Sequence, residues 1–262
     1  MSTYNTILAE LQKSNTESTT DIYVPSQEQN VAFRQLNVKA QKNIIRSALS
    51  SDGTNISFNL HANEMIYNHT DARNILVTDR APILLGLRNE NLDSNIVVEE
   101  TTIGIDNIIS TYEQKLPGKL ELKSQATHES ITVFMTVPTL ETDTKFLRQC
   151  QQEIKGMLTE DTVGESVGTM YLYELAKVVD RIQYKMQTPA LSGEEAQVNI
   201  HTVKFENTSV PECLSMIELL PASINKKLVE FITQIREFES LTCTDPESNI
   251  QIPVDVSLFT LD

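Results

Sequence analysis

The spacing of apolar residues predicts a short helix near the start of the chain. Residues 2–13 place apolar side chains on one helical face, at Ile7, Leu8 and Leu11. The polar residues 15–20 follow, and their Asn, Thr, Glu and Ser content favours a loop. We therefore expect an N-terminal helical arm over residues 1–20, docked either on its own domain or on a partner.

The next segment mixes strand and helix periodicities. Residues 21–24 and 31–36 alternate apolar and polar positions, which predicts a hairpin. Asn37 is a suitable cap for a helix over 38–49, and a second helix is expected from Thr54 or Asn55. An α+β domain over residues 21–140 is therefore expected. Its other predicted elements are an apolar helix with Ile83, Leu84 and Leu87 in the core, and strands over 96–98, 103–109, 120–123 and 131–137.

From residue 141 the pattern becomes mainly helical. Helices are predicted over 143–157, 166–182, 209–220 and 222–238, with a loop at 189–195 and a strand over 198–205. Pro221 separates the last two helices because proline breaks or kinks a helix. The predicted fold class is α+β, with mixed helices, antiparallel hairpins and a mainly helical, acidic C-terminal region over residues 141–262.

Several short motifs in the first 110 residues resemble one protein family. They are Pro25-Ser26, Phe33-Arg34-Gln35-Leu36, the Lys-rich helix from Lys39 to Lys42, Thr78-Asp79-Arg80 and Leu84-Leu85-Gly86-Leu87-Arg88. Their order is similar to that in the baseplate hub proteins of T-even-type contractile-tailed bacteriophages. Each motif also has a structural explanation, since Asp79 in a first helical turn favours the helix dipole.

Net charge bears on the class of partner. The chain has a formal charge of −15, with 11 Lys/Arg against 16 Asp/Glu in residues 1–140 and 10 against 20 in residues 141–262. An acidic surface of this kind disfavours nucleic acid and anionic membranes. It is explained either by solubility alone or by a face that docks a basic protein. The sequence also lacks a membrane-length apolar run and a signal-peptide pattern, so we expect a cytoplasmic protein.

Candidate chemistry is sparse. Cys150, Cys213 and Cys243 are too widely spaced for a disulfide framework or a structural zinc site. His61 and Glu64 lie one helical turn apart, but no third metal ligand is indicated. A Ser-x-x-Lys match at residues 223–226 lacks the companion motifs of β-lactam enzymes and is better read as a helix start. We predict no catalytic residues, no cofactor and no metal.

The resemblance implies a non-enzymatic protein of the phage baseplate hub. It would act in tail assembly in the host bacterial cytoplasm, either as an assembly factor that leaves or as a subunit of the virion baseplate. Its partners would be hub or tape-measure proteins, and the oligomeric state is left open. The alternative is an enzyme with a pocket between the β-rich middle and the helical C-terminal region.

The C-terminal tail is the predicted partner-binding segment. It alternates weakly and ends in an apolar run, whereas a terminus that is not held down is normally polar. Two explanations are equally supported: an anchor for a partner, or an edge strand on the chain's own sheet. The candidate residues are Val254, Val256, Leu258 and Phe259.

Overall fold

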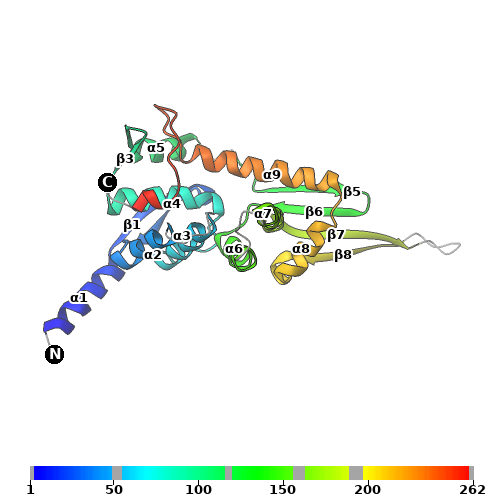
Figure 1. Ribbon diagram of the computed structural model, residues 1–262, viewed down its shortest axis with the longest axis horizontal. Coiled ribbons are helices and arrows are strands. Elements are labelled where there is room, and N and C mark those ends of the chain that lie inside the picture. Colours follow the sequence, from blue (N-terminus) through cyan, green and yellow to red (C-terminus); the bar gives the residue numbers. More distant parts are fainter. Residues whose placement is uncertain (1–2, 49–54, 116–119, 156–162, 189–196, 260–262) are drawn as a thin grey trace. The chain divides into compact units, whose positions relative to one another are not determined.

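The computed structural model describes residues 3–48, 55–115, 120–155, 163–188 and 197–259. The chain forms two compact units (Figure 1). Unit 1 combines Met1–Lys119 with Glu237–Asp262, and unit 2 is Leu120–Arg236. The expected boundaries at residues 20 and 140 divide the chain differently, because the C-terminal segment packs with the N-terminal one.

Unit 1 is built around helix α4 (Arg80–Asn91) and the hairpin of β1 (Thr19–Val24) and β2 (Gln29–Arg34). Ile83, Leu84 and Leu87 of α4 are fully buried, as predicted. The hairpin lies so close to α4 that a Cβ on Gly86 would be 2.7 Å from Ile22 Cγ2, which explains the glycine there. The other elements of unit 1 are α1 (Thr3–Glu17), η1 (Pro25–Gln27), α2 (Val38–Ala48), α3 (Ile56–His69), η2 (Val77–Asp79), β3 (Asn95–Val98), β4 (Thr101–Gly104), α5 (Ile105–Lys115) and η4 (Val256–Phe259).

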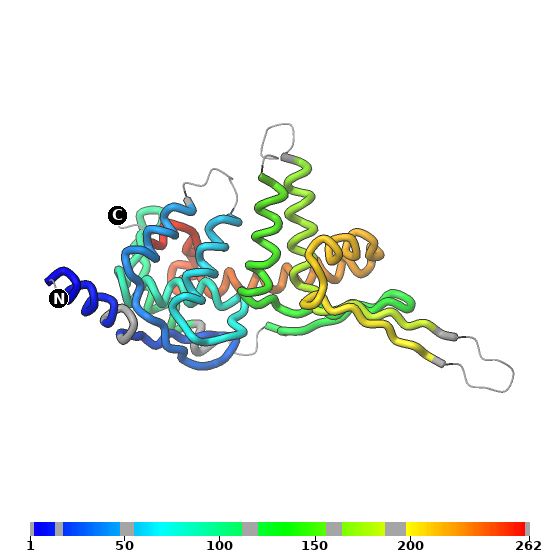
Figure 2. Tube along the Cα trace, turned by 90° about the horizontal axis from the view of Figure 1, so that it is seen from below, coloured from blue at the N-terminus to red at the C-terminus, as the bar shows by residue number. Residues whose placement is uncertain are grey.

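Unit 2 is a four-stranded antiparallel sheet with helices on one face (Figure 2). The strand order is β5 (Lys123–His128), β6 (Ile131–Thr136), β7 (Val179–Thr188) and β8 (Gln197–Lys204). Val133 and Met135 of β6 are buried, whereas Lys123 and Gln125 of β5 are exposed. The helices are α6 (Leu140–Ile154), α7 (Val163–Lys177) and α8 (Val210–Glu218), with η3 (Phe205–Asn207) before α8. Helix α9 (Ala222–Leu241) begins in unit 2 and ends in unit 1.

Most predicted elements are present, and the α+β class is confirmed. Local capping explains where several helices begin. Asn37 Oδ1 accepts from Ala40 N at 3.0 Å, and Ser209 forms a capping box with Glu212 at the start of α8. The predicted loop at 189–195 lies outside the described residues.

Four local predictions are wrong. Residues 120–122, predicted as part of a strand, precede strand β5, which begins at Lys123. Residues 105–109 belong to helix α5 rather than to a strand, and residues 179–182 open strand β7 rather than close a helix. Helix α1 also extends to Glu17, inside the predicted polar loop. Short apolar runs rich in Ile and Val fit a buried strand and a buried helix equally well, so tertiary packing decides between them.

Candidate interaction surfaces

The motifs that suggested the hub resemblance meet inside unit 1. Asp79 is fully buried, and its carboxylate accepts three hydrogen bonds. Ser26 donates its backbone N–H to Oδ1 at 2.9 Å and its hydroxyl to Oδ2 at 2.6 Å, and Leu76 N donates to Oδ2 at 2.8 Å. Burial raises the pKa of Asp79 above its ordinary value, and the hydrogen bonds from Ser26 and Leu76 oppose this shift. The Pro-Ser and Thr-Asp-Arg motifs therefore form one structural contact.

Other motif residues also hold unit 1 together. Leu36 N donates to Asn91 Oδ1 at 2.9 Å, which joins the hairpin to the end of α4. Arg34 contacts Asp71 at 3.4 Å, in a largely exposed ion pair. Arg88 is buried and donates to the carbonyl of Leu258 at 2.5 Å. These contacts give the motifs a structural role within this chain.

The predicted partner-binding tail packs on its own chain. Its last described residues form the 3-10 turn η4, which lies against α2 and α4. Leu258 and Phe259 are 0% and 2% exposed, and Val254 and Val256 are half-buried. The tail is a turn rather than the edge strand that we considered. While this packing persists, Leu258 and Phe259 are not accessible to a partner.

Helix α1 has the apolar surface that the tail lacks. It extends away from the rest of unit 1, and its main contact there is with β2 (Figure 1). Tyr4, Ile7, Leu8 and Leu11 form a stripe at helical spacing, and they are 71%, 56%, 40% and 58% exposed. We call these four residues the α1 stripe. The sequence identified three of them, and it left the docking of the helix open.

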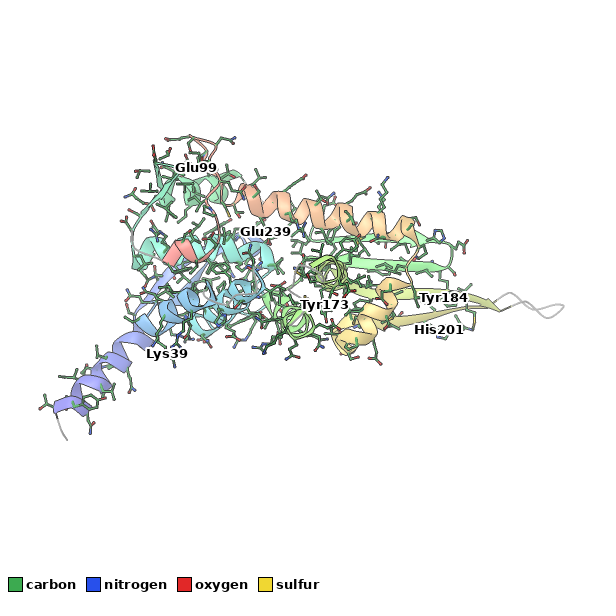
Figure 3. The ribbon with its side chains drawn as sticks, viewed as in Figure 1. Lys39, Glu99, Tyr173, Tyr184, His201 and Glu239 are labelled. Atoms are coloured by element: carbon green, nitrogen blue, oxygen red, sulfur yellow. The ribbon has the colours of Figure 1, made fainter. Side chains whose placement is uncertain are left out.

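A polar cluster lies between α6 and α7 of unit 2. Tyr173, labelled in Figure 3, donates its hydroxyl to Glu153 Oε2 at 2.6 Å. Lys177 Nζ lies 3.1 Å from Asp143 Oδ1 and 2.7 Å from Glu174 Oε1. Burial, reinforced by the hydrogen bond to Glu153, raises the pKa of Tyr173 far above its usual range. The phenol is thus held neutral, and the cluster joins two helices through satisfied partners.

The cysteines are similarly unreactive in their surroundings. Burial raises the pKa of Cys150 to about 11 and that of Cys243 to about 12, and it also raises the pKa of Cys213. A nucleophilic cysteine needs a lowered pKa, because the thiolate is the reactive form. The shifts therefore disfavour thiol catalysis at these three positions.

One Ser–His contact occurs in unit 2. Ser223 Oγ, near the start of α9, lies 2.9 Å from His128 Nδ1 on β5. In the described part of the chain no carboxylate accepts a hydrogen bond from His128, so the third group that orients a catalytic histidine is not in place there. The residues at 223–226 lie in the first turn of α9, as the helix-start interpretation predicted.

No family model, curated protein or solved structure that we compared matches this chain. The hub resemblance thus rests on the motifs quoted above. Within the described ranges, no three His, Cys, Asp or Glu side chains are grouped to hold a metal ion. The helices in those ranges also include none with the length and apolar content needed to span a membrane.

The sheet of unit 2 carries a surface that sequence reasoning missed. Its four strands contain Lys123, Arg181, Lys185 and Lys204 but only one acid, Asp180, which pairs with Arg181. The guanidinium of Arg181 also lies 3.9 Å from the ring centroid of Phe134. The acids of residues 141–262 therefore lie mainly outside the strands. If residues 179–188 had been predicted as a strand, the sequence would have placed Arg181 and Lys185 in this basic sheet.

Proposed function

We propose that this protein is a non-enzymatic assembly protein of the phage baseplate hub, which acts by binding another protein. The observation that supports binding to another protein is the α1 stripe. An amphipathic helix that leaves its apolar face uncovered is the form in which many proteins present a helix to a groove.

The stripe fits an apolar groove on a hub or tape-measure protein better than a second copy of this chain. Stable protein interfaces bury roughly 1,200–2,000 Å². Two copies would be joined by only four side chains each, and one of these, Leu8, is only 40% exposed. Such an interface would bury too little surface for a stable dimer. A groove encloses a helix on several sides and so buries more surface per residue. Residues 3–13 contain one acid and one base, Glu10 and Lys13, so the apolar stripe dominates recognition.

A membrane is a poorer fit for α1. Helices that lie in a bilayer interface are rich in Lys and Arg on their polar face. The described helix has only Lys13, opposed by Glu10 and Glu17. The hub assignment itself rests on the motif order, and the α1 stripe supports the protein-binding part of the proposal.

The test is co-purification of the tagged full chain from cells infected by the phage that carries its gene. We expect tail hub or tape-measure proteins to be recovered and identified by mass spectrometry. A double variant, Ile7→Gln and Leu11→Gln, keeps good helix formers and should lose these partners. Thr6→Gln, on the opposite face of α1, is the matched control and should retain them.

Two outcomes would overturn the proposal. One is recovery of no tail protein with the wild-type chain. The other is equal recovery with the wild type and the Ile7/Leu11 double variant, which would remove the α1 stripe from the function. Circular dichroism and thermal unfolding establish that each variant is folded before the comparison is made.

A further inference from the structure

Strand β8 forms an uncovered edge of the unit 2 sheet. It is the last strand in the order, and no described strand pairs with its outer side. Successive residues of a strand point their main-chain N–H and C=O groups to opposite neighbours. The N–H of Lys185 in β7 donates to the Ser130 carbonyl beside β6 at 2.8 Å. The main-chain groups of the neighbouring Tyr184 therefore point to β8, where Tyr184 pairs with His201. Alternation then directs the main-chain groups of Val198, Ile200, Thr202 and Lys204 to the free edge.

The same hairpin exposes apolar side chains on both of its faces. Tyr184 and His201 lie on one face (Figure 3), and the pair of Lys185 and Ile200 lies on the other. Folded proteins normally protect a long apolar edge strand with a bulge, a proline or a covering element, because it pairs readily with other chains. The exposed apolar residues are Tyr184 (45%), Met186 (42%), Val198 (53%), Ile200 (55%) and Val203 (39%).

Charge indicates the chemistry of the missing strand. Residues 181–188 and 197–204 hold Arg181, Lys185 and Lys204 and no acid, in a chain whose net charge is −15. Lys185 and Lys204 are exposed. Arg181 already pairs with Asp180, and Lys204 lies 3.4 Å from Glu206 in an exposed ion pair, so Lys185 is the strand cation for which the described residues supply no acidic partner. The acids Glu194 and Glu195 belong to the connecting segment, which lies outside the described residues. The strands themselves therefore favour an acidic partner.

We propose that β8 binds an extended segment of another polypeptide as a fifth strand of the sheet, and that this segment alternates acidic and apolar residues. Main-chain hydrogen bonds at the edge require an extended backbone. On the face that carries Ile200, carboxylates would complement Lys185 and Lys204, and on the opposite face apolar side chains would cover Val203. A second copy of β8 fits less well, since two basic hairpins would meet. This inference uses different residues from the α1 stripe and is independent of the hub assignment.

The experiment is selection of displayed random peptides of about twelve residues on the full chain, followed by affinity measurement with the synthetic peptides. The central variant is Thr202→Pro. Its N–H points to the free edge, so proline removes an edge donor and spares the β7–β8 hydrogen bonds. Thr202→Ala retains the N–H and is the matched control. The charge variant is Lys185→Glu with Lys204→Glu.

We expect the selected peptides to alternate acidic and apolar residues. Thr202→Pro should weaken their binding by about tenfold or more, and Thr202→Ala by less than about twofold. The charge variant should weaken binding by about tenfold or more, and it keeps the test valid if the proline variant does not fold.

The proposal is overturned if no peptide is enriched, if the selected peptides lack acids, or if they bind Thr202→Pro as they bind the wild type. It is also overturned if sedimentation shows a wild-type dimer that Thr202→Pro dissociates, since a second copy would then occupy the edge.

Discussion

At the scale of single residues, the Ser26–Asp79 contact is the most informative feature of unit 1. A buried carboxylate is stable only when its oxygens are hydrogen-bonded, and three donors satisfy Asp79. Ser26→Ala removes the 2.6 Å hydroxyl bond and should lower the free energy of unfolding by about 1.5–3 kcal/mol. The control is Ser215→Ala, because the exposed hydroxyl of Ser215 bonds only to its own helix. This variant should change the free energy of unfolding by less than about 0.5 kcal/mol.

A double-mutant cycle distinguishes this bond from general packing. If Ser26→Ala costs the same in an Asp79→Asn background as in the wild type, the two side chains are not coupled and the structural role assigned to the motifs is incorrect. Urea unfolding, followed by hydrogen exchange of α4 amides, reports on unit 1 specifically.

The thiols give a second prediction at the residue scale. With a pKa of about 11, Cys150 is roughly one-thousandth thiolate at pH 8, and Cys243, at about 12, is ten times less ionised. In the folded protein we expect Cys150 and Cys243 to react with Ellman's reagent at least about a hundredfold more slowly than a free thiol, and Cys213, whose pKa burial also raises, to react more slowly than a free thiol. In urea all three should react at the free rate. Rapid labelling of one native cysteine would contradict the buried, neutral state described for it.

At the scale of elements, local rules account for most helices and hairpins but not for their long-range contacts. The Asn37 cap and the Ser209–Glu212 capping box are visible in the sequence, because a cap and its helix are neighbours in the chain. The Ser26–Asp79 contact joins residues 53 positions apart, and nothing in either motif specifies the other. The errors at 105–109 and 179–182 have the same cause, since both are short apolar runs whose conformation depends on their neighbours in space.

The tail shows this limit at the candidate site. The apolar residues within 254–259 predicted that this segment packs against something, but the sequence left the docking surface open between a partner and the chain's own sheet. The structure packs Leu258 and Phe259 on α2 and α4, and the buried Arg88 donates to the Leu258 carbonyl. A tail that fills a core cannot be distinguished by composition from one that fills a partner's groove.

The packing of η4 gives the prediction for this element. Leu258→Ala removes a fully buried side chain and should destabilise unit 1 by about 2–5 kcal/mol. Val38→Ala, at a position 78% exposed, is the matched control and should stay within about 0.5 kcal/mol of the wild type. Deleting residues 250–262 should destabilise unit 1 further, because it also leaves Arg88 without this acceptor. A truncated chain with the wild-type urea midpoint would show that the tail is not part of the core.

At the scale of the whole molecule, the charge is arranged by element rather than by half. Residues 141–262 contain 20 acids and 10 bases, yet the two strands within them, β7 and β8, have three bases and one acid. A single acidic face for residues 141–262 is therefore too simple a description. The two proposed surfaces differ accordingly: the α1 stripe is apolar on a nearly neutral helix, and the β8 edge is basic.

This difference predicts how salt affects a complex formed through α1. Raising NaCl from 0.1 M to 1 M shortens the screening length from about 10 Å to about 3 Å, which weakens attraction between exposed charges. Charges around an interface act mainly on the association rate, whereas buried apolar contacts determine the dissociation rate. With a purified hub partner that is basic, salt should slow association with the −15 chain and change dissociation by less than about twofold. The Ile7→Gln, Leu11→Gln double variant should leave the association rate nearly unchanged and increase the dissociation rate by about tenfold or more. Surface plasmon resonance measures both rates. If salt instead accelerates dissociation and the double variant does not, charge rather than the α1 stripe holds the complex together.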